Sequence, residues 1–325
     1  MKLKSMLTRC MLTVVGLTCA ALSSAQDVYP SKPIRLLVGF APGGPADGLA
    51  RIVAQSVSGS IGQPIIVDNK PGAGGTIAAA QAAKAPPDGY TLLLVSSGHA
   101  GNGAYYGNLS YETVKSFSPV GGVASSPVVV LVNATSPYKS LADLLADARK
   151  RPGALNYGTG GGATLTNLAA EQLKSDAGID ARGISYKGSG PALTAAMAGE
   201  VDAVFDTVSS AVGLVRSGKL RALAVTSDKR SAVLPQVPTV AEQGVPRFDT
   251  TGWFGILAPA GTSPSVINRF NAELNQALAS AAVREKLAGL GAESMEGRPA
   301  QFGQFIESET ARWSALIRRL NLRAE

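Results

Sequence analysis

Short runs of apolar and β-branched residues recur along the chain, and helical patterns lie between them. Runs that are apolar on both sides of a strand are typical of strands buried under helices on both faces, which is the environment of a parallel sheet. We therefore predict an α/β fold with mainly parallel sheets flanked by helices. The predicted strands are 34–38, 65–67, 91–95, 127–132, 155–157, 183–186, 201–205, 220–225 and 252–257.

Two of the intervening helices have clear start signals. Ser140 precedes an amphipathic run that stops at Pro152, so we expect a helix capped by the serine. Pro264 follows Ser263 at an expected first helical position, and a final amphipathic helix is expected over about 300–320. Apolar stripes on such helices are far more often core than ligand contacts, so we assign them no function.

The chain has 325 residues, enough for one large or two medium domains, but no linker long enough to separate independent domains. We predict a two-lobed molecule in which the chain crosses between the lobes twice. The hinge candidates are the glycine-rich segment 121–126 and the proline-rich, irregular segment 236–251. Lobe 1 is then discontinuous, 26–125 plus 250–325, and lobe 2 is 126–249.

The first 25 residues differ from the rest. A basic start with Lys2, Lys4 and Arg9 precedes an almost wholly apolar or small stretch, 10–22, which ends before Ala25. This pattern predicts a secretory signal peptide, 1–25, and hence a periplasmic protein. The apolar stretch is shorter than the roughly 20 residues that span a bilayer, which disfavours a membrane anchor. A lipoprotein acylated at Cys19 is the less favoured alternative.

Both cysteines, Cys10 and Cys19, lie in this predicted leader, so the exported chain would have no disulfide and would depend on its core for stability. Without the leader's three basic residues, 27 Lys and Arg stand against 23 Asp and Glu, a net charge of +4. This excess is mild, and no basic run is interleaved with aromatic residues. We therefore expect no nucleic-acid partner.

A first candidate site loop, 39–47, follows a predicted strand and opens a helix. It contains Phe40, Ala41, Gly43, Gly44 and Asp47. Glycines let the backbone approach a ligand closely, and the free amides of a helix N-terminus suit a carboxylate. Asp47 is expected to accept hydrogen bonds from nearby amides. The alternative is a tight turn before a capped helix, with no ligand.

A second loop, 156–167, repeats the order of strand, glycines and helix. Four of the five residues in 158–162 are glycine, and Thr159, Thr164 and Thr166 add hydroxyls. The phosphate-loop pattern G-x-x-x-x-G-K-[ST] is absent, and a G-x-G-x-x-A match alone is weak evidence for a dinucleotide. The strand after the helix has no acidic residue at its end to hold a ribose. We therefore expect no cofactor.

A third loop, 96–102, contains Ser96, Ser97 and His99, the only histidine. We expect His99 to be a loop residue. No H-E-x-x-H pattern or cysteine cluster accompanies it, so no metal is expected, and no G-x-S-x-G elbow occurs. An exported α/β hydrolase that uses His99 with a serine remains the alternative function.

Two aspartates, Asp202 and Asp206, flank the predicted strand 201–205. On one face of a strand they would lie about 13 Å apart, which is wider than the carboxylate pairs of glycosidases. In one interpretation Asp206 faces a cleft and meets an amino group of a ligand. We favour the other, in which both aspartates cap local backbone groups.

Many collinear segments resemble one family. They include residues 29–35, Pro42-Gly43-Gly44 with Asp47, and residues 67–75, 87–92, 186–188, 199–202, 220–225 and 237–240. With these segments, nearly all of the chain after the leader is similar to the substrate-binding receptors of tripartite tricarboxylate transporters, the Bug family. The resemblance implies a periplasmic, monomeric clamshell that captures a small carboxylate without chemistry and delivers it to inner-membrane transporter subunits.

In that family the ligand carboxylate is held by main-chain amides, hydroxyls and waters from both lobes. Carried over by motif position and joined to the loops above, the predicted ligand-binding residues are Phe40, Ala41, Gly43, Gly44, Asp47, Ser96, Ser97, Thr159, Gly161, Ala163, Thr164 and Asp206. Leu165 and Asn167 replace a serine and a histidine that the family commonly has. The ligand therefore stays open among di- and tricarboxylates, acidic amino acids and aromatic acids, and a sensor for a membrane signalling partner is an alternative role.

Overall fold

The computed structural model describes residues 29–162, 164–186 and 188–324. The predicted leader, 1–25, lies outside these ranges. All nine predicted strands are present in the described ranges, together with a short tenth strand that the sequence did not suggest. The strands are β1 (Ile34–Val38), β2 (Ile65–Asn69), β3 (Thr91–Ser96), β4 (Phe117–Asn133), β5 (Asn156–Thr159), β6 (Arg182–Ser185), β7 (Ala203–Thr207), β8 (Leu220–Val225), β9 (Thr251–Pro259) and β10 (Glu293–Ser294).

Two helices, α5 and α9, begin where the sequence signals predicted. Ser140 accepts a hydrogen bond from the Asp143 amide at the start of α5, and Pro264 is the first residue of α9. Both predictions are confirmed. The helices are α2 (Pro45–Ile61), α3 (Thr76–Ala83), α4 (Gly98–Tyr106), α5 (Leu141–Lys150), α6 (Leu165–Ala177), α7 (Ser189–Ala198), α8 (Val208–Arg216), α9 (Pro264–Ala279), α10 (Ala281–Gly289) and α11 (Pro299–Arg319), with 3-10 turns η2 (Ala73–Gly75) and η3 (Ala241–Gln243). Within the described ranges, no helix has the length and apolar character to cross a membrane.

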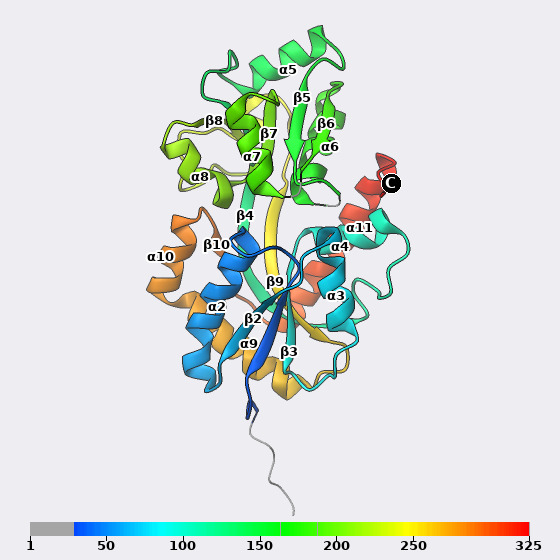
Figure 1. Cartoon of the computed structure of the whole chain (residues 1–325), viewed down its shortest axis with the longest axis vertical. Helices are drawn as coiled ribbons and strands as arrows, with labels where there is room; N and C mark the ends of the chain where they lie inside the picture. The colour runs from blue at the N-terminus through cyan, green and yellow to red at the C-terminus, as the bar shows by residue number, and fades with distance from the viewer. Residues whose placement is uncertain (1–28, 163, 187, 325) are drawn as a thin grey trace, which may run out of the picture.

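Figure 1 shows two lobes stacked along the long axis, each a sheet with helices on its faces. Lobe 1 contains β2, β1, β3, β9 and the first half of β4, and lobe 2 contains the second half of β4 with β7, β5, β6 and β8. The predicted two-lobed α/β fold is confirmed. The pairing is more mixed than predicted, because β9 runs antiparallel to β3 and β4, and β4 antiparallel to β7 and β8. Such central strands are buried whichever way they run, so their apolar pattern does not reveal their direction.

Strand β4 belongs to both lobes. It pairs with β9 as far as Pro127, opposite Thr251, and from Val128 onward it pairs with β7 and β8. The segment 121–126, a predicted hinge candidate, is part of this strand, with register shifts between Pro119 and Gly121 and between Gly122 and Ala124. Its glycines serve close packing, because a Cβ on Gly122 would lie 2.6 Å from the carbonyl oxygen of Met295. The amide of Thr250 still donates to the carbonyl of Thr226 in lobe 2, and β9, which follows, pairs with β3 and β4 in lobe 1.

The parallel strands of both lobes point their carboxyl ends at the region where the lobes meet, which we call the junction. In lobe 2, Thr207 at the end of β7 pairs with Val128. In lobe 1, Ser96 at the end of β3 pairs with Phe254, close to the β9 end at the junction. Ligands of open α/β sheets bind outside the carboxyl ends of strands, so the fold directs two such ends at one place.

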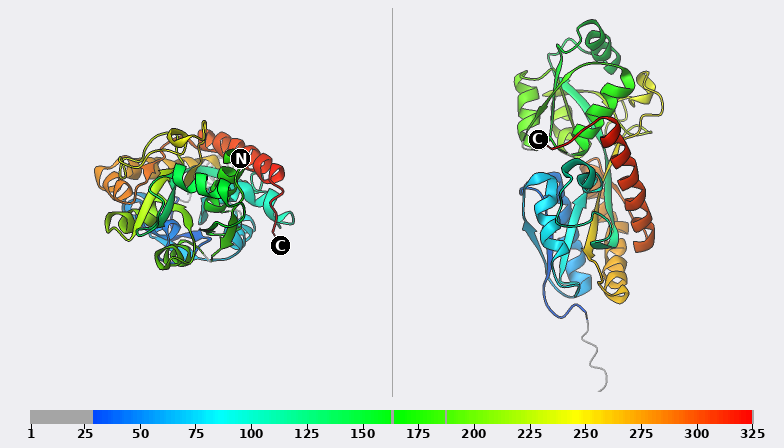
Figure 2. Two further views of the ribbon diagram at one scale, coloured as in Figure 1. Left: turned by 90° about the horizontal axis from the view of Figure 1, so that it is seen from above. Right: turned by 90° about the vertical axis from the view of Figure 1, so that its right-hand side faces the viewer.

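The C-terminal helix α11 extends from lobe 1 alongside lobe 2 (Figure 2). Arg319 near its end forms an ion pair with Asp176 of α6, with an N···O distance of 3.4 Å. A Cβ on Gly101 of α4 would lie 3.0 Å from Ile317 of α11 and 3.6 Å from Leu168 of α6. Helices from both lobes therefore pack together on this side, and the lobes share one hydrophobic cluster.

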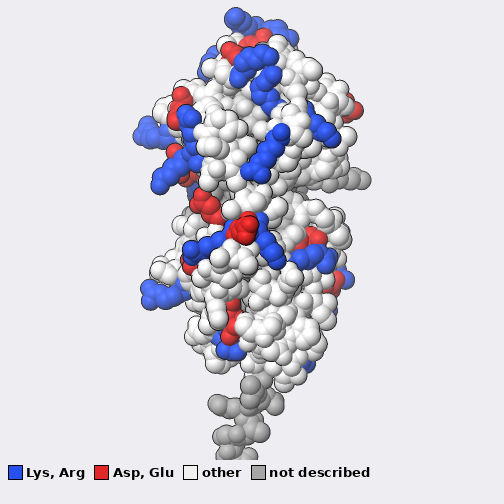
Figure 3. All heavy atoms as spheres, turned by 90° about the vertical axis from the view of Figure 1, so that its left-hand side faces the viewer, with Lys and Arg blue, Asp and Glu red and all other residues white. Residues whose placement is uncertain are grey.

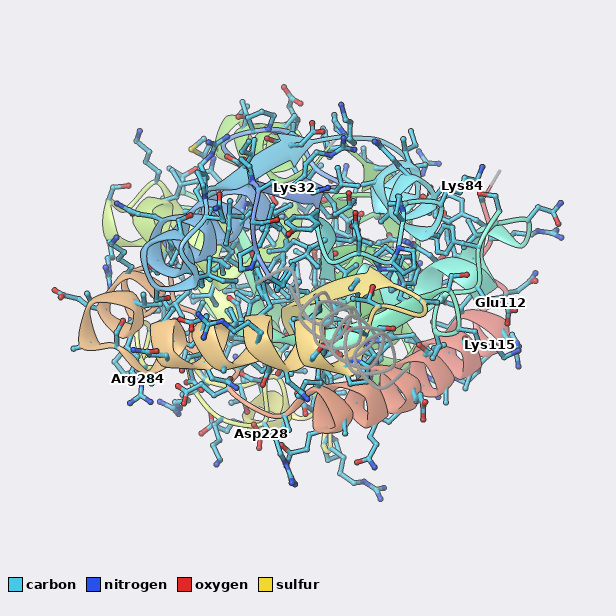
Figure 4. All side chains as sticks on the ribbon, turned by 90° about the horizontal axis from the view of Figure 1, so that it is seen from below. Lys32, Lys84, Glu112, Lys115, Asp228 and Arg284 are labelled. Carbon is cyan, nitrogen blue, oxygen red and sulfur yellow. The ribbon has the colours of Figure 1, made fainter. Side chains whose placement is uncertain are left out.

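Charged side chains lie mainly on the outside. Basic groups predominate on the upper lobe in Figure 3, while basic and acidic groups are mixed on the lower lobe. Lys115 and Glu112 project outward in Figure 4, and their ion pair measures 2.8 Å with both side chains well exposed. Exposed pairs of this kind contribute little to stability.

Candidate functional site

Helices that follow the carboxyl end of a parallel strand begin without a side-chain cap. This holds, among the described residues, for α2, α3, α4, α6, α7 and α8. In contrast, α5, α9 and α10 begin elsewhere in the fold, and a serine hydroxyl caps each of them. Helix α11 also begins elsewhere, and the side chain of its N-cap residue Arg298 makes no cap hydrogen bond. An uncapped helix start leaves backbone N–H groups free and carries partial positive charge. Both lobes therefore direct free donors at the junction, which is an arrangement suited to an anion.

The first loop is held in shape by Asp47, which is almost fully buried. Its carboxylate accepts hydrogen bonds from the Gly43 amide (3.0 Å), Arg51 Nε (2.9 Å) and Asn69 Nδ2 (3.0 Å). Burial raises the pKa of Asp47, but these hydrogen bonds outweigh it and hold the pKa below its usual range. The predicted local role of Asp47 is confirmed. Phe40, Ala41, Gly43 and Gly44 remain partly or well exposed around it.

In the second loop the hydroxyls fold the chain back on itself. Thr159 is fully buried and accepts from the Gly161 amide (3.2 Å), while Thr166 accepts from the Gly160 amide (3.0 Å). Thr164 donates to the carbonyl of Gly161 (2.7 Å). The hydroxyls predicted to meet a ligand therefore also determine the shape of the glycine turn.

Asn167, which replaces the family's usual histidine, joins this network. It accepts a hydrogen bond from Thr159 (3.2 Å) and donates one to the carbonyl of Gly162 (2.9 Å). Gly161 has φ +70° and would place a Cβ 2.9 Å from Ser185, so only glycine fits there. Ala163, another predicted site residue, lies outside the described residues.

The two loops are linked through a turn and a helix that sequence reasoning missed. The first loop packs against Gly75 of η2, where a Cβ on Gly39 would lie 2.5 Å from the Gly75 Cα. The preceding residue, Gly74, lies beside the hydroxyl of Tyr106 on α4, and that hydroxyl also lies beside Gly162 of the second loop. A small cavity at the ends of β1 and β3 is lined by Phe40, Ser96, Gly74, Gly75 and Asn102, among others. In the sequence, the glycines around Gly74 were the signal that could have located this link.

Ser97 and Asp206, two predicted site residues, are buried at the junction. The Ser97 amide donates to the carbonyl of Trp253. The Asp206 carboxylate accepts from Ser189 Oγ (2.8 Å) and from the Thr207 amide (2.7 Å). Burial raises the pKa of Asp206 to about 6, against the opposing effect of these hydrogen bonds. Asp202 accepts from the Asn156 amide (2.9 Å), so both aspartates accept hydrogen bonds from backbone amides, and a ligand contact of Asp206 stays a prediction.

Comparison with known proteins identifies the family to which this chain belongs. Residues 49–322 match the family described as tripartite tricarboxylate transporter family receptor. The chain is a member of this receptor family. Protein BugT of Bordetella pertussis is 38% identical over 316 residues, covering 95% of this chain and 96% of BugT.

Solved structures of similar proteins share the fold. The periplasmic binding protein BugD is 32% identical with a TM-score of 0.84, covering 91% of this chain and 100% of BugD. Rpa4515 of R. palustris, solved with adipate, is 35% identical with a TM-score of 0.87, covering 91% of this chain and 100% of that one. MatC of Rhodopseudomonas palustris, solved with malate, is 33% identical with a TM-score of 0.82, covering 89% and 100%. The family is one of periplasmic receptors.

His99 in this receptor is a core residue, and its predicted place in a loop is wrong. It lies in α4, which begins at Gly98 directly after β3, although glycines and an asparagine in 98–103 are poor helix formers. Its side chain is buried, with Nε2 2.9 Å from the carbonyl oxygen of Thr113 and the ring stacked on Tyr111. Burial lowers the pKa of His99 to about 4. Across the described ranges, no three His, Cys, Asp or Glu side chains are grouped to hold a metal.

Proposed function

We propose that this chain is a periplasmic solute receptor that binds a small carboxylate at the junction and delivers it to a tripartite tricarboxylate-type membrane transporter. The observation that carries the proposal is the set of uncapped helix starts that both lobes direct at one place. The two nearby carboxylates, Asp47 and Asp206, already accept hydrogen bonds from groups of the protein, so they do not take up the free amides. Relatives solved with adipate and with malate support the ligand class.

In this proposal the Gly44 amide and the free amides at the starts of α2 and α6 hold the ligand carboxylate. The Gly43, Gly160 and Gly161 amides already donate to Asp47, Thr166 and Thr159, so Gly43 and Gly161 contribute by shaping the two loops. Asp47 acts by fixing the first loop. The lobes are 26–125 plus 250–325 and 126–249, the leader is cleaved after Ala25, and the receptor works as a monomer. The other proposed contacts are Phe40, Ala41, Ser96, Ser97, Thr159, Ala163, Thr164 and Asp206.

A thermal-shift screen tests the proposal. The purified protein is denatured and refolded to remove carried-over ligand, then screened against di- and tricarboxylates, acidic amino acids and aromatic acids. A ligand at about 100 times its dissociation constant should add about 2.7 kcal/mol to the free energy of unfolding. Absence of any shift across the panel would contradict carboxylate binding.

An Asp47→Asn variant tests the first loop. The amide side chain can no longer accept all three hydrogen bonds, so the first loop, and with it the free Gly44 amide, loses its fixed position. We expect affinity for the best ligand to fall about tenfold in isothermal titration calorimetry, the equivalent of about 1.4 kcal/mol. Asp143→Asn is the matched control, because Asp143 accepts amide hydrogen bonds at the start of the distant helix α5. Equal affinities of the Asp47 variant and the wild type would exclude this role for Asp47.

A further inference from the structure

Tyr106, the last residue of α4, lies where loops from the two lobes approach one another. A Cβ on Gly74 of lobe 1 would lie 3.1 Å from the Tyr106 hydroxyl, and a Cβ on Gly162 of lobe 2 would lie 3.2 Å from it. Figure 1 shows α4 at the end of lobe 1 that faces α6. The phenol therefore spans the junction between the two glycine turns.

The position of Tyr106 is set by its helix and not by its hydroxyl. One turn earlier, Asn102 Nδ2 donates to the carbonyl of Gly74 at 3.5 Å. Gly101 packs against Leu168 of lobe 2, and the carbonyl of Tyr105 accepts from the Ala324 amide at 3.0 Å. Helix α4 is thus fixed by contacts with Gly74, with Leu168 of lobe 2 and with Ala324. These contacts set the position of the Tyr106 side chain.

The Tyr106 hydroxyl itself has no hydrogen-bond partner among the described residues. The hydroxyl lies beside the backbones of the two glycines, and the Tyr106 ring lies 5.1 Å from the ring of Tyr105 between centroids. Burial, together with Tyr105, raises the pKa of Tyr106, so the phenol keeps its proton at neutral pH and can donate it. A partly buried donor between two lobes that has no partner of its own can be satisfied by an acceptor on a bound ligand.

We propose that Tyr106 determines the ligand class of the junction site: its hydroxyl donates a hydrogen bond to the second carboxylate of a linear dicarboxylate whose first carboxylate is held by the helix amides. This inference rests on the proposed carboxylate-binding function. A monocarboxylate of equal length places a methyl group there instead, leaves the hydroxyl unpaired and binds less tightly. A site built around a hydrogen-bonding group discriminates strongly against the analogue that lacks the partner.

The test compares Tyr106→Phe with the wild type on matched acids. Succinate, glutarate and adipate are each paired with the monocarboxylate of the same carbon number, and dissociation constants are measured by calorimetry. For the tightest dicarboxylate we expect the variant to lose about tenfold or more in affinity, the usual contribution of a hydrogen bond to a charged group. Its affinity for the paired monocarboxylate should stay within about twofold.

Two controls separate ligand recognition from a structural role. Because the Tyr106 hydroxyl has no partner among the described residues, Tyr106→Phe should leave the urea midpoint unchanged. Tyr138→Phe removes a hydroxyl that donates to Asp147 in lobe 2, so it should lower the midpoint and leave binding unchanged. Equal losses on both acids, or no loss on the dicarboxylate, would overturn the role of Tyr106. If the wild type bound none of the paired dicarboxylates but another carboxylate of the wider panel, the Tyr106 inference would fail while the carboxylate function stood.

Discussion

Two buried titratable side chains, His99 and Asp206, have pKa values displaced by the same cause. Desolvation disfavours the charged form of each, which lowers the pKa of the histidine to about 4 and raises that of the aspartate to about 6. Neither shift requires a catalytic partner. Opposite shifts of this kind give opposite dependences of stability on pH.

Between pH 4 and 6, these two shifts should have opposing effects on the free energy of unfolding. As the pH falls through this range, the unfolded chain protonates His99 before the folded protein does, which lowers the free energy of unfolding. Over the same range the folded protein protonates Asp206 before the unfolded chain does, which raises it. Replacing one of the two groups should reveal the effect of the other. The free energy of unfolding should then change by up to about 1.4 kcal/mol per pH unit.

Urea unfolding, followed by tryptophan fluorescence at pH 4.5 and 6.0, measures how the free energy of unfolding changes with pH. Relative to the wild type, Asp206→Asn should lose stability on acidification, and His99→Gln should gain it. Identical changes with pH in both variants would show that one of the two groups is not buried as described.

At the scale of the element, the same residue type serves two different purposes. Gly255 in β9 lies under Phe302 of α11, and a Cβ there would be 2.0 Å from the phenyl ring. At Gly59 in α2, no atom lies within 4 Å of the position that a Cβ would occupy. The first glycine permits a helix to pack on a strand, while the second only weakens its helix.

The two alanine variants should therefore change stability in opposite directions. Gly255→Ala forces Phe302 away and should lower the free energy of unfolding by about 1–3 kcal/mol or more. Gly59→Ala improves helix propensity and should raise it by about 0.5–1 kcal/mol. Denaturant titrations of both proteins provide the comparison, and a stabilising Gly255→Ala would contradict the packing of α11 on β9.

At the scale of the whole molecule, the two lobes share part of their hydrophobic core. One hydrophobic cluster contains Leu93 of lobe 1, Leu168 and Tyr157 of lobe 2, and Trp313 of α11. Strand β4 adds a continuous backbone connection through the same region. Relative motion of the lobes must therefore preserve or exchange these contacts.

We expect calorimetry of the ligand-free protein to show one cooperative unfolding transition. Leu168→Ala removes a fully buried side chain from the shared cluster and should lower stability by about 2–5 kcal/mol. Because the cluster joins both lobes, the transition should shift as a whole. Two resolved transitions in the wild type would show that the shared cluster does not couple the lobes.

Much of the fold was predictable because its signals are local. Apolar runs located nine strands, and Ser140 and Ser263 located helix starts, because strand burial and capping depend on neighbouring residues. The glycine loops before α2 and α6 were identified for the same reason. The two-residue strand β10 is too short to have a pattern, and the strand character of 121–126 was hidden because its glycines resemble a hinge.

The order of elements, the positions of the two glycine turns and the family resemblance were determined by the sequence alone, because each depends on residues close together in the chain. The tertiary structure decided the antiparallel direction of β9, the burial of His99 and the meeting of Gly74, Tyr106 and Gly162. These features depend on which distant segments become neighbours when the core closes. The packing of the whole chain determines which segments become neighbours, and no local sequence pattern predicts it.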